Sequence, residues 1–325
     1  MRVLITGGTG FLGQQIAREL IAADETPVIA GRALDRLDPA LARAVETRSL
    51  DLREHEAVVA ACAGVEAVVH AGALSAPWGP PRLFRAVNIG GTASVIAGCR
   101  RHGVRRLVYV SSPSVVFDGR DVVRATEAAP FPRRFLSDYA LTKKIGEDLV
   151  REAAGDLETV IVRPKALFGP GDTALLPRLI AAARRRRLPL IGDGRNLVDL
   201  TYVENAAQAI VLALRCPRAV GRTYTITNGE PALLWEVIRR VLAHLGLPPP
   251  GPRLPLRAAL VLARILEAAA ARSGREPALT RYTVLLLART QTYDIAAARC
   301  DLGYQPRISL EEGIARTLAA LRQAA

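Results

Sequence analysis

Three polar side chains have the types and the spacing that proton transfer to a carbonyl oxygen requires. Tyr139 and Lys143 stand four residues apart, so on a helix they share one face. A free tyrosine, with a pKa of about 10, is a reluctant acid at neutral pH. A nearby ammonium lowers that pKa because it stabilises the phenolate. Ser112 can hold the oxygen on which charge develops when a hydride adds to a ketone, so Ser112, Tyr139 and Lys143 are predicted to be catalytic.

Lysine is scarce in this chain, and the positions of the few lysines indicate the same chemistry. Of the 44 basic residues, all but Lys143, Lys144 and Lys165 are arginine. An ammonium is a compact donor that can relay protons, whereas a guanidinium stays charged, so position 143 is expected to need an amine. Lys144 points about 100° away on the helix and is given no role. Lys165 is a candidate partner for a substrate carboxylate, with an ordinary loop lysine as the alternative.

A glycine-rich segment near the amino terminus lies between an apolar run at Val3–Ile5 and a helical pattern at Gln14–Leu20. Glycines allow positive φ and let the backbone approach a pyrophosphate, and a helix start supplies N–H donors. Its place after a strand and before a helix makes a dinucleotide site the preferred interpretation. The residues predicted to contact the cofactor here are Gly7, Thr9, Gly10, Phe11, Leu12 and Gly13.

The end of the second apolar run, Pro27–Ala30, separates NAD from NADP. NAD enzymes place a carboxylate there for the ribose hydroxyls. This chain has Gly31 or Arg32, depending on a one-residue offset. A carboxylate would repel a 2′-phosphate, whereas Arg32 can bind it through two hydrogen bonds. The sequence therefore predicts NADP(H), and Arg36 is interpreted as a surface arginine.

Further cofactor contacts are expected where later strands end. Asp51 follows the third apolar run, where it can meet the adenine amino group or, alternatively, cap the next helix. Small residues follow His70 and suit close passage beside the cofactor, so His70 itself is expected to be structural. The predicted cofactor contacts outside the glycine segment and Arg32 are Asp51, Leu52, Ala71, Gly72, Ala73, Tyr139, Lys143 and Pro164.

The elements that must position these residues alternate between apolar β-branched runs and helical patterns. Such alternation predicts an α/β, doubly wound (Rossmann) parallel sheet. We expect residues 1–166 to form the NADP-binding domain, completed by elements within 196–228, and residues 167–325 to form a smaller, mostly helical substrate lobe. The expected strands are Val3–Ile5, Pro27–Ala30, Glu46–Leu50, Ala67–His70, Arg106–Ser111 and Thr159–Arg163, and the expected helices include Gln14–Leu20, Glu54–Cys62, Arg82–His102 and Asp138–Ala154.

Two apolar segments in the C-terminal part, Arg257–Ala271 and Thr283–Leu287, are too short to span a membrane. We expect them to form walls or a cap of a substrate pocket, with a helix lying on a membrane surface as the alternative.

Composition narrows the classes of function. The four cysteines are scattered and lack metal-ligand spacing, which indicates a reduced, cytoplasmic, metal-free protein, and no secretion signal is recognised at the amino terminus. A net charge of +13 suggests nucleic acid, but the arginines are dispersed and aromatic residues are too few for stacking platforms. No nucleic-acid partner is expected, and part of the charge is expected to attract anionic ligands.

Together the motifs resemble the extended short-chain dehydrogenase/reductase family over roughly the first 210 residues. The resemblance implies Ser112, Tyr139 and Lys143 as the catalytic trio and Asn88 as a fourth member or substrate contact. It also implies a homodimer through the helices at 82–102 and 138–154. The matching pieces are Gly7–Gly13, Asn88–Thr92, Tyr109–Ser112, Tyr139–Lys143, Arg163–Pro164 and Thr201–Asn205.

Within that family, Val110–Gly119 resembles the 3β-hydroxysteroid dehydrogenase branch. Phe131–Arg134 and Gly169–Asp172 are most similar to bacterial 2-alkyl-3-oxoalkanoate reductases of olefin biosynthesis. This similarity implies NADPH-dependent reduction of a hydrophobic 3-keto acid, in association with other enzymes of the pathway. A 3β-hydroxysteroid or sterol dehydrogenase is the alternative. Related nucleotide-sugar epimerases carry an Arg-Asp pair where this chain has Val198-Asp199, and valine cannot bind a diphosphate. A regulatory protein of the same fold is disfavoured by the tyrosine–lysine pair.

Overall fold

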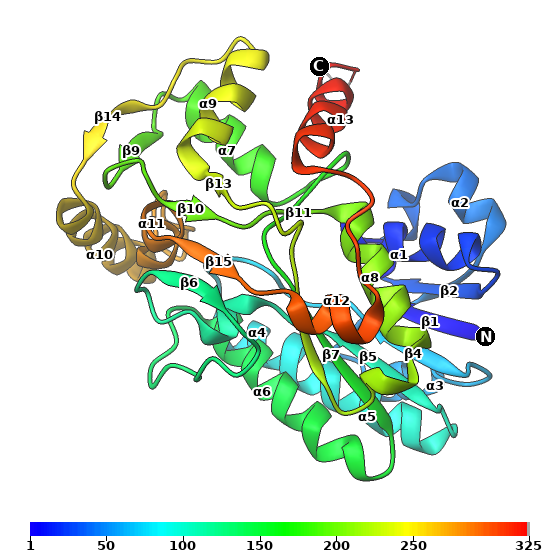
Figure 1. Ribbon diagram of the computed structural model, residues 1–325. Coiled ribbons are helices and arrows are strands. Elements are labelled where there is room, and N and C mark those ends of the chain that lie inside the picture. The colour runs from blue at the N-terminus through cyan, green and yellow to red at the C-terminus, as the bar shows by residue number, and fades with distance from the viewer. Residues whose placement is uncertain (324–325) are drawn as a thin grey trace.

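A seven-stranded parallel sheet forms the centre of the molecule, in the order β12-β7-β5-β4-β1-β2-β3 (Figure 1). The structure is a computed structural model and describes residues 1–323. The predicted doubly wound sheet is confirmed, and the six expected strands are present to within a residue or so at each end. The strands are β1 (Arg2–Thr6), β2 (Thr26–Gly31), β3 (Glu46–Ser49), β4 (Ala67–His70), β5 (Arg106–Val110), β7 (Glu158–Pro164) and β12 (Thr223–Ile226).

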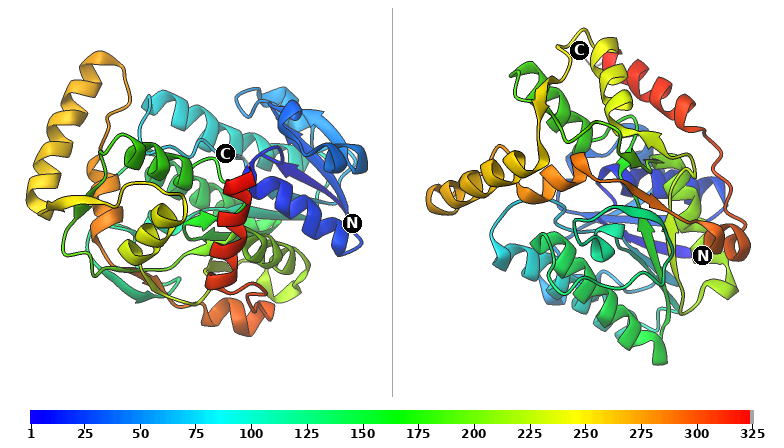
Figure 2. Two further views of the ribbon diagram at one scale, coloured as in Figure 1. Left: turned by 90° about the horizontal axis from the view of Figure 1, so that it is seen from above. Right: turned by 60° about the vertical axis from the view of Figure 1, so that its left-hand side comes forward.

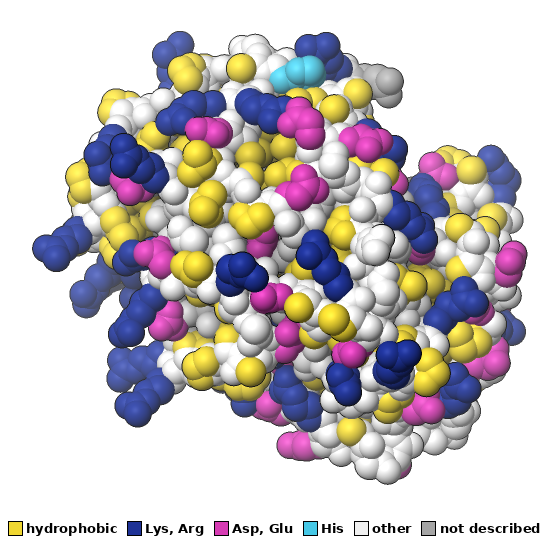
Figure 3. Space-filling model, viewed as in Figure 1, with side chains coloured by type: hydrophobic (Ala, Val, Ile, Leu, Met, Phe, Trp, Pro, Cys, Tyr) yellow, Lys and Arg dark blue, Asp and Glu magenta, His cyan; other side chains and the backbone are white. Residues whose placement is uncertain are grey.

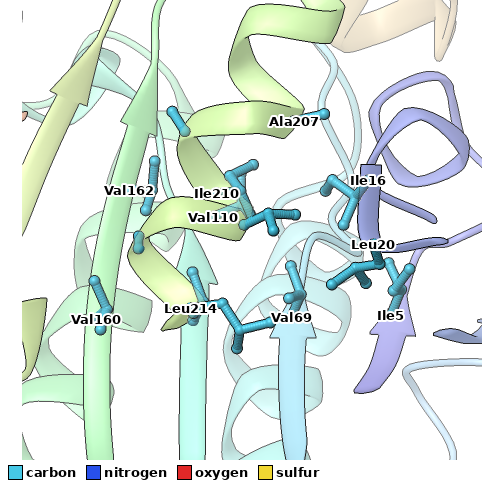
Figure 4. Packing of buried hydrophobic residues seen from close by; sticks show 14 of the residues in the cluster. Ile5, Ile16, Leu20, Val69, Val110, Val160, Val162, Ala207, Ile210 and Leu214 are labelled. Carbon is cyan, nitrogen blue, oxygen red and sulfur yellow. The ribbon is translucent and has the colours of Figure 1, made fainter. Parts of the chain in front are cut away.

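Helices cover both faces of this sheet, which is why its strands read as continuous apolar runs. Alternate residues of each strand enter opposite cores: Val108 of β5 packs with α1 and α8, whereas Leu107 packs with α3, α5 and α6. Figure 4 shows Ile16, Leu20 and Ile210 meeting the strand side chains of the first core. The helices are α1 (Phe11–Ala22), α3 (His55–Ala60), α5 (Gly91–Arg101), α6 (Asp138–Glu152) and α8 (Val203–Arg215); α2 (Pro39–Ala44) lies beyond β2.

The helix predicted over Arg82–His102 is interrupted. It consists of α4 (Pro81–Phe84), a π-helical turn at Arg85–Gly90, and α5. A π-helical turn widens the backbone spiral locally and is frequent at functional sites. Here it contains the buried Asn88, whose side chain bonds away from its own helix, as described below.

The C-terminal part builds small sheets beside the carboxyl ends of the main strands. One four-stranded sheet has the order β13-β10-β15-β6, and the pairs β11-β8 and β14-β9 are separate. Because β6 comes from the first half of the chain, its pairing with β15 ties the two parts together. The strands are β6 (Val122–Ala125), β8 (Leu167–Phe168), β9 (Pro189–Ile191), β10 (Leu197–Val198), β11 (Thr201–Tyr202), β13 (Ala232–Leu233), β14 (Gly251–Leu254) and β15 (Gln291–Tyr293).

Helices surround these small sheets, and one of them returns to the main sheet. Ala298 and Leu302 of α12 (Ala296–Leu302) join the same core as α1 and α8, which the sequence patterns did not indicate. None of the helices in residues 1–323 has the length and apolarity needed to cross a membrane. The others are α7 (Leu175–Arg184), α9 (Leu234–His244), α10 (Leu256–Ser273), α11 (Arg281–Ala288) and α13 (Leu310–Gln323).

Candidate active site

The glycine segment turns sharply between β1 and α1 and packs against the loop after β4. Gly7 has φ +69°, and a Cβ at this position would lie 2.5 Å from Gly72 Cα. A Cβ on Gly13 would lie 2.3 Å from the Gly7 carbonyl oxygen, so the helix can start this close only without a side chain. Gly10 precedes α1, and no side chain caps the first N–H groups of the helix. These amides are therefore available to an anionic group such as a pyrophosphate.

The end of β2 has no room for a carboxylate. A Cβ on Gly31 would lie 2.6 Å from Thr9 Oγ1 and 2.9 Å from its methyl carbon. The next residue, Arg32, is exposed and forms no ion pair within residues 1–323. Its charge contributes to the low pKa of Asp51, so the guanidinium lies near the Asp51 carboxylate, which follows β3.

Asp51 is already engaged within the chain. Arg53 donates to both of its carboxylate oxygens, with Nη2 2.6 Å from Oδ2, and this pairing lowers the pKa of Asp51 to about 2. The carboxylate also accepts a hydrogen bond from the Arg53 backbone N–H at 2.9 Å. Asp51 is not the N-cap of α3, since Glu54 occupies that position. Asp51 therefore stabilises the turn before α3. The neighbouring Leu52 packs beside Gly72, since a Cβ on Gly72 would lie 2.8 Å from Leu52 Cδ1.

Lys143 is buried in the middle of α6, with 2% of its surface exposed. Its Nζ lies 3.8 Å from the centroid of the Tyr109 ring, a cation–π contact. The Tyr109 hydroxyl donates to the Lys143 backbone carbonyl at 3.4 Å. It fits there because Gly146 has no side chain, as a Cβ would lie 2.1 Å from that hydroxyl. Burial lowers the pKa of Lys143 to about 7, and Glu147 acts in the opposite direction.

Glu147 is one helical turn beyond Lys143 and is completely buried. Arg163 of β7 binds it through two hydrogen bonds, Nε to Oε1 at 2.7 Å and Nη2 to Oε2 at 2.6 Å, and Arg151 adds a third at 2.6 Å. Burial alone would raise the pKa of Glu147, but the bonds from Arg163 bring it below its ordinary value. The pair fixes α6 to β7 directly behind Lys143. This role of Glu147 was not predicted from the sequence, although Tyr139, Lys143 and Glu147 follow one another at intervals of four residues.

Tyr139 is half-buried at the start of α6. Burial raises the pKa of its phenol, while hydrogen bonding to the Ser75 and Ser112 hydroxyls acts to lower it. The expectation that the Lys143 ammonium lowers this pKa is not met, because that ammonium faces the Tyr109 ring instead. Ser112 Oγ accepts from the Ser114 N–H at 3.2 Å and keeps its own proton for another partner. Ser75, from the loop after β4, had no signal in the sequence.

Asn88 holds that loop from behind. Its Oδ1 accepts from the Leu74 N–H at 2.7 Å, and its Nδ2 donates to the Leu74 carbonyl at 3.2 Å and to Thr142 Oγ1 at 3.0 Å. Because these bonds use the Nδ2 donors of Asn88, the geometry favours a role in which Asn88 positions Ser75 and α6. A direct contact between Asn88 and a substrate is disfavoured.

His70 has the structural environment that the sequence suggested. It is fully buried between Thr6 Oγ1, 2.6 Å from Nδ1, and Thr92 Oγ1, 3.0 Å from Nε2. Burial lowers its pKa to about 3, so the ring is neutral near pH 7 and links β1, β4 and α5.

The C-terminal part supplies the opposite side of the site. Burial raises the pKa of Tyr282 of α11, and the nearby Tyr139 phenol raises it further, so the two rings lie close together. The segment Arg257–Ala271 was expected to form a wall or a cap of a substrate pocket, and in the structure Ala259 and Ala263 of α10 pack against Val284 of α11. Thus α11 lies next to Tyr139 and α10 stands behind it.

Lys165 follows Pro164, the last residue of β7, and is half-buried. Its Nζ donates to Gln291 Oε1 at 2.6 Å and lies 5.8 Å from the Tyr293 ring centroid. Burial lowers the pKa of Lys165 to about 8, and Asp199 acts against this shift.

Asp199 is buried beside this lysine. Its Oδ2 accepts from the Tyr293 N–H at 2.7 Å, while Oδ1 has no partner among residues 1–323. Burial raises its pKa to about 6. Val198, where epimerases carry arginine, is buried in an apolar cluster.

Known proteins resemble this chain in sequence and in fold. A profile of the 3-beta hydroxysteroid dehydrogenase/isomerase family matches residues 4–256. A 2-alkyl-3-oxoalkanoate reductase of Stenotrophomonas maltophilia is 39% identical over 98% of this chain and 99% of its own length. A decarboxylating sterol-4-alpha-carboxylate 3-dehydrogenase of Saccharomyces cerevisiae is 34% identical over 98% and 97%. In fold, the chain is similar to a short-chain dehydrogenase/reductase superfamily protein from Agrobacterium tumefaciens with bound NAD, at 24% identity, TM-score 0.75 and coverage of 100% and 98%.

Proposed function

The chain belongs to the 3-beta hydroxysteroid dehydrogenase/isomerase family, and we propose that it is an NADPH-dependent reductase of a hydrophobic 3-keto acid. It is an oxidoreductase acting on a 3-keto or 3-hydroxy group; the finer proposal is a 2-alkyl-3-oxoalkanoate as substrate and the 3-hydroxy acid as product. The observation that carries the proposal is the proximity of the Tyr139 phenol to the Ser112 and Ser75 hydroxyls, which act to lower its pKa, with Lys165 beside Gln291 of the C-terminal part. The similarity to 2-alkyl-3-oxoalkanoate reductases supports it.

The protonation of Tyr139 suits reduction. When bound, NADPH supplies the hydride for the keto carbon. Tyr139 then donates its proton to the developing alkoxide, and Ser112 holds the same oxygen. Because burial raises the pKa of Tyr139, the phenol is protonated at neutral pH, which is the form an acid needs. Lys143, with its pKa of about 7, can return a proton to Tyr139, which becomes a phenolate when it has donated its own. Oxidation of an alcohol would instead need the phenolate as base.

Preference for NADPH is supported at the end of β2. Thr9 fills the space where a residue-31 side chain would stand, and Arg32 is exposed and free of ion pairs within residues 1–323. Arg32→Ala is expected to weaken NADPH binding by roughly tenfold or more, the typical worth of a charge-assisted hydrogen bond, and to leave NADH binding almost unchanged. Fluorescence titration with both cofactors measures this, and an equal effect on both would overturn the preference.

The substrate carboxylate is assigned to Lys165. Its ammonium has one side-chain hydrogen-bond partner in residues 1–323, Gln291 of β15 in the C-terminal part. A sterol or steroid 3β-dehydrogenase is the second candidate, favoured by the yeast relative.

One assay series decides between these candidates. NADPH and NADH oxidation is followed with long-chain 2-alkyl-3-keto acids, with 3-ketosteroids and with UDP-sugars. Turnover restricted to the steroids would transfer the assignment to the second candidate, and turnover restricted to UDP-sugars would remove both.

We also propose a homodimer through α5 and α6. A groove between these helices is lined by small and apolar residues, among them Ala93, Ala97 and Leu149, and by the charged Arg100, Arg101 and Glu152 at one end. The small residues would allow helices of a second copy to pack. Light scattering is expected to give twice the chain mass, and Ala97→Glu is expected to give the monomer. The proposal includes association of this protein with the enzymes that act before and after the reduction.

A further inference from the structure

The outer face of α10 carries an apolar stripe with no covering element. Three of the nine large apolar side chains that are exposed among residues 1–323 are Val261, Leu262 and Ile265, at 60%, 43% and 61% exposure. Helical spacing places them on one face, opposite the buried Ala259 and Ala263. Figure 2 shows α10 along one edge of the molecule. The stripe therefore points away from the protein and cannot line the active site.

Arginines surround this stripe and lack acidic partners. Arg257 and Arg264 flank it along one side of the helix, and Arg253, Arg272 and Arg275 stand at its ends. All five are exposed, and none forms an ion pair within residues 1–323. The neighbouring acids are already neutralised: Glu267 pairs with Arg281 at 2.6 Å, and Glu276 pairs with Arg178 at 2.8 Å. Figure 3 shows basic side chains projecting from the edge where Figure 1 places α10.

We propose that this face of α10 is a docking surface for an anionic lipid bilayer. Apolar side chains enter the boundary between headgroups and acyl chains, while flanking arginines extend towards phosphates. A second copy is a poorer occupant, because a two-fold contact would bring the same unpaired arginines against each other. The inference deepens the proposed function and rests on it in one respect. Since α10 packs against α11, which carries Tyr282 to Tyr139, docking would hold the site close to a membrane that dissolves long-chain keto acids.

The test is sedimentation of the full-length protein with vesicles of phosphatidylcholine and phosphatidylglycerol in equal parts, compared with phosphatidylcholine alone. We expect binding to the mixed vesicles only, weakened by salt. Arg257→Ala with Arg264→Ala is expected to lower the partition coefficient by roughly 30-fold, from the usual contribution of two basic residues at an anionic surface. Val261→Gln with Ile265→Gln is expected to abolish binding. A matched control is Ile21→Gln with Val220→Gln, which removes two apolar side chains of 41% and 37% exposure elsewhere and should leave binding unchanged.

Each outcome decides the proposal. Absence of binding by the native protein, or equal binding by the α10 variants and the control, overturns it. A change from dimer to monomer in the Val261→Gln, Ile265→Gln protein, measured by light scattering, would give the face to a second copy instead. Turnover of a short, water-soluble 3-keto acid should be unaffected by every variant. Vesicle binding without any such turnover would contradict the proposed reductase while leaving the docking surface standing, so the two failures are distinguishable.

Discussion

The two lysines of the site, the buried Lys143 on the cofactor side and the half-buried Lys165 on the lobe side, are held in different ways. Lys143 lies over an aromatic ring, and the acid near it, Glu147, is already bound by Arg163. Lys165 has one amide partner and stands near Asp199, whose second oxygen has no partner in residues 1–323. The first lysine is locked in place by the fold. The second retains hydrogen-bond donors for a ligand. Asp199 and Lys165 itself have pKa values of about 6 and about 8, so both change charge near neutral pH.

Of the two lysines, Lys143 is expected to show the larger effect on substitution. Lys143→Met should lower turnover by roughly a hundredfold or more, the usual contribution of a group in general acid–base catalysis, while NADPH still binds. Lys144→Met on the same helix is the matched control, because Lys144 pairs with Asp148 at 2.6 Å and faces away from the site. Steady-state kinetics of both variants measure this contrast. Equal losses would mean that the helix, and not the buried amine, matters.

A smaller and different effect is expected on the lobe side. Lys165→Met should raise the KM for a 3-keto acid by roughly 10- to 100-fold, which corresponds to a lost hydrogen bond to a charged group, with kcat little changed. The methyl ester of the same substrate lacks the carboxylate charge, so its KM should hardly move. An identical change for acid and ester would remove Lys165 from carboxylate recognition.

The smallest effect is a pH dependence of the same side. The pKa of Asp199 is raised to about 6, so the group is neutral below that pH and charged above it. A charged Asp199 repels a substrate carboxylate. The KM for the keto acid should therefore rise by a few fold as pH increases through 6, and again above about 8 as Lys165 loses its proton. Asp199→Asn should remove the first rise and keep the second. A first rise that persists in the variant would assign it to another group.

The same contrast explains what the sequence could predict. Tyr139 and Lys143 share a helix, and the glycine segment is continuous, so spacing alone brings these residues together. The Ser75 hydroxyl, Tyr282 and Gln291 reach the site from separate loops, helices and strands, and Gln291 meets Lys165 across 126 residues of chain. Periodicity carries no information on such distant contacts. The same holds for the Tyr109 ring, which takes the Lys143 ammonium that was expected beside Tyr139.

Side-by-side turnover of the native protein and Tyr139→Phe shows whether Tyr139 is the proton donor in the reduction of a 3-keto acid. NADPH oxidation is followed with a 2-alkyl-3-oxoalkanoate, the 3-hydroxy acid is quantified, and NADPH binding is measured by fluorescence. We expect one hydroxy acid per NADPH for the native protein, a loss of turnover of roughly a thousandfold in the variant, and equal NADPH binding by both. No NADPH oxidation by the native protein, or undiminished turnover by Tyr139→Phe, would contradict this proposal.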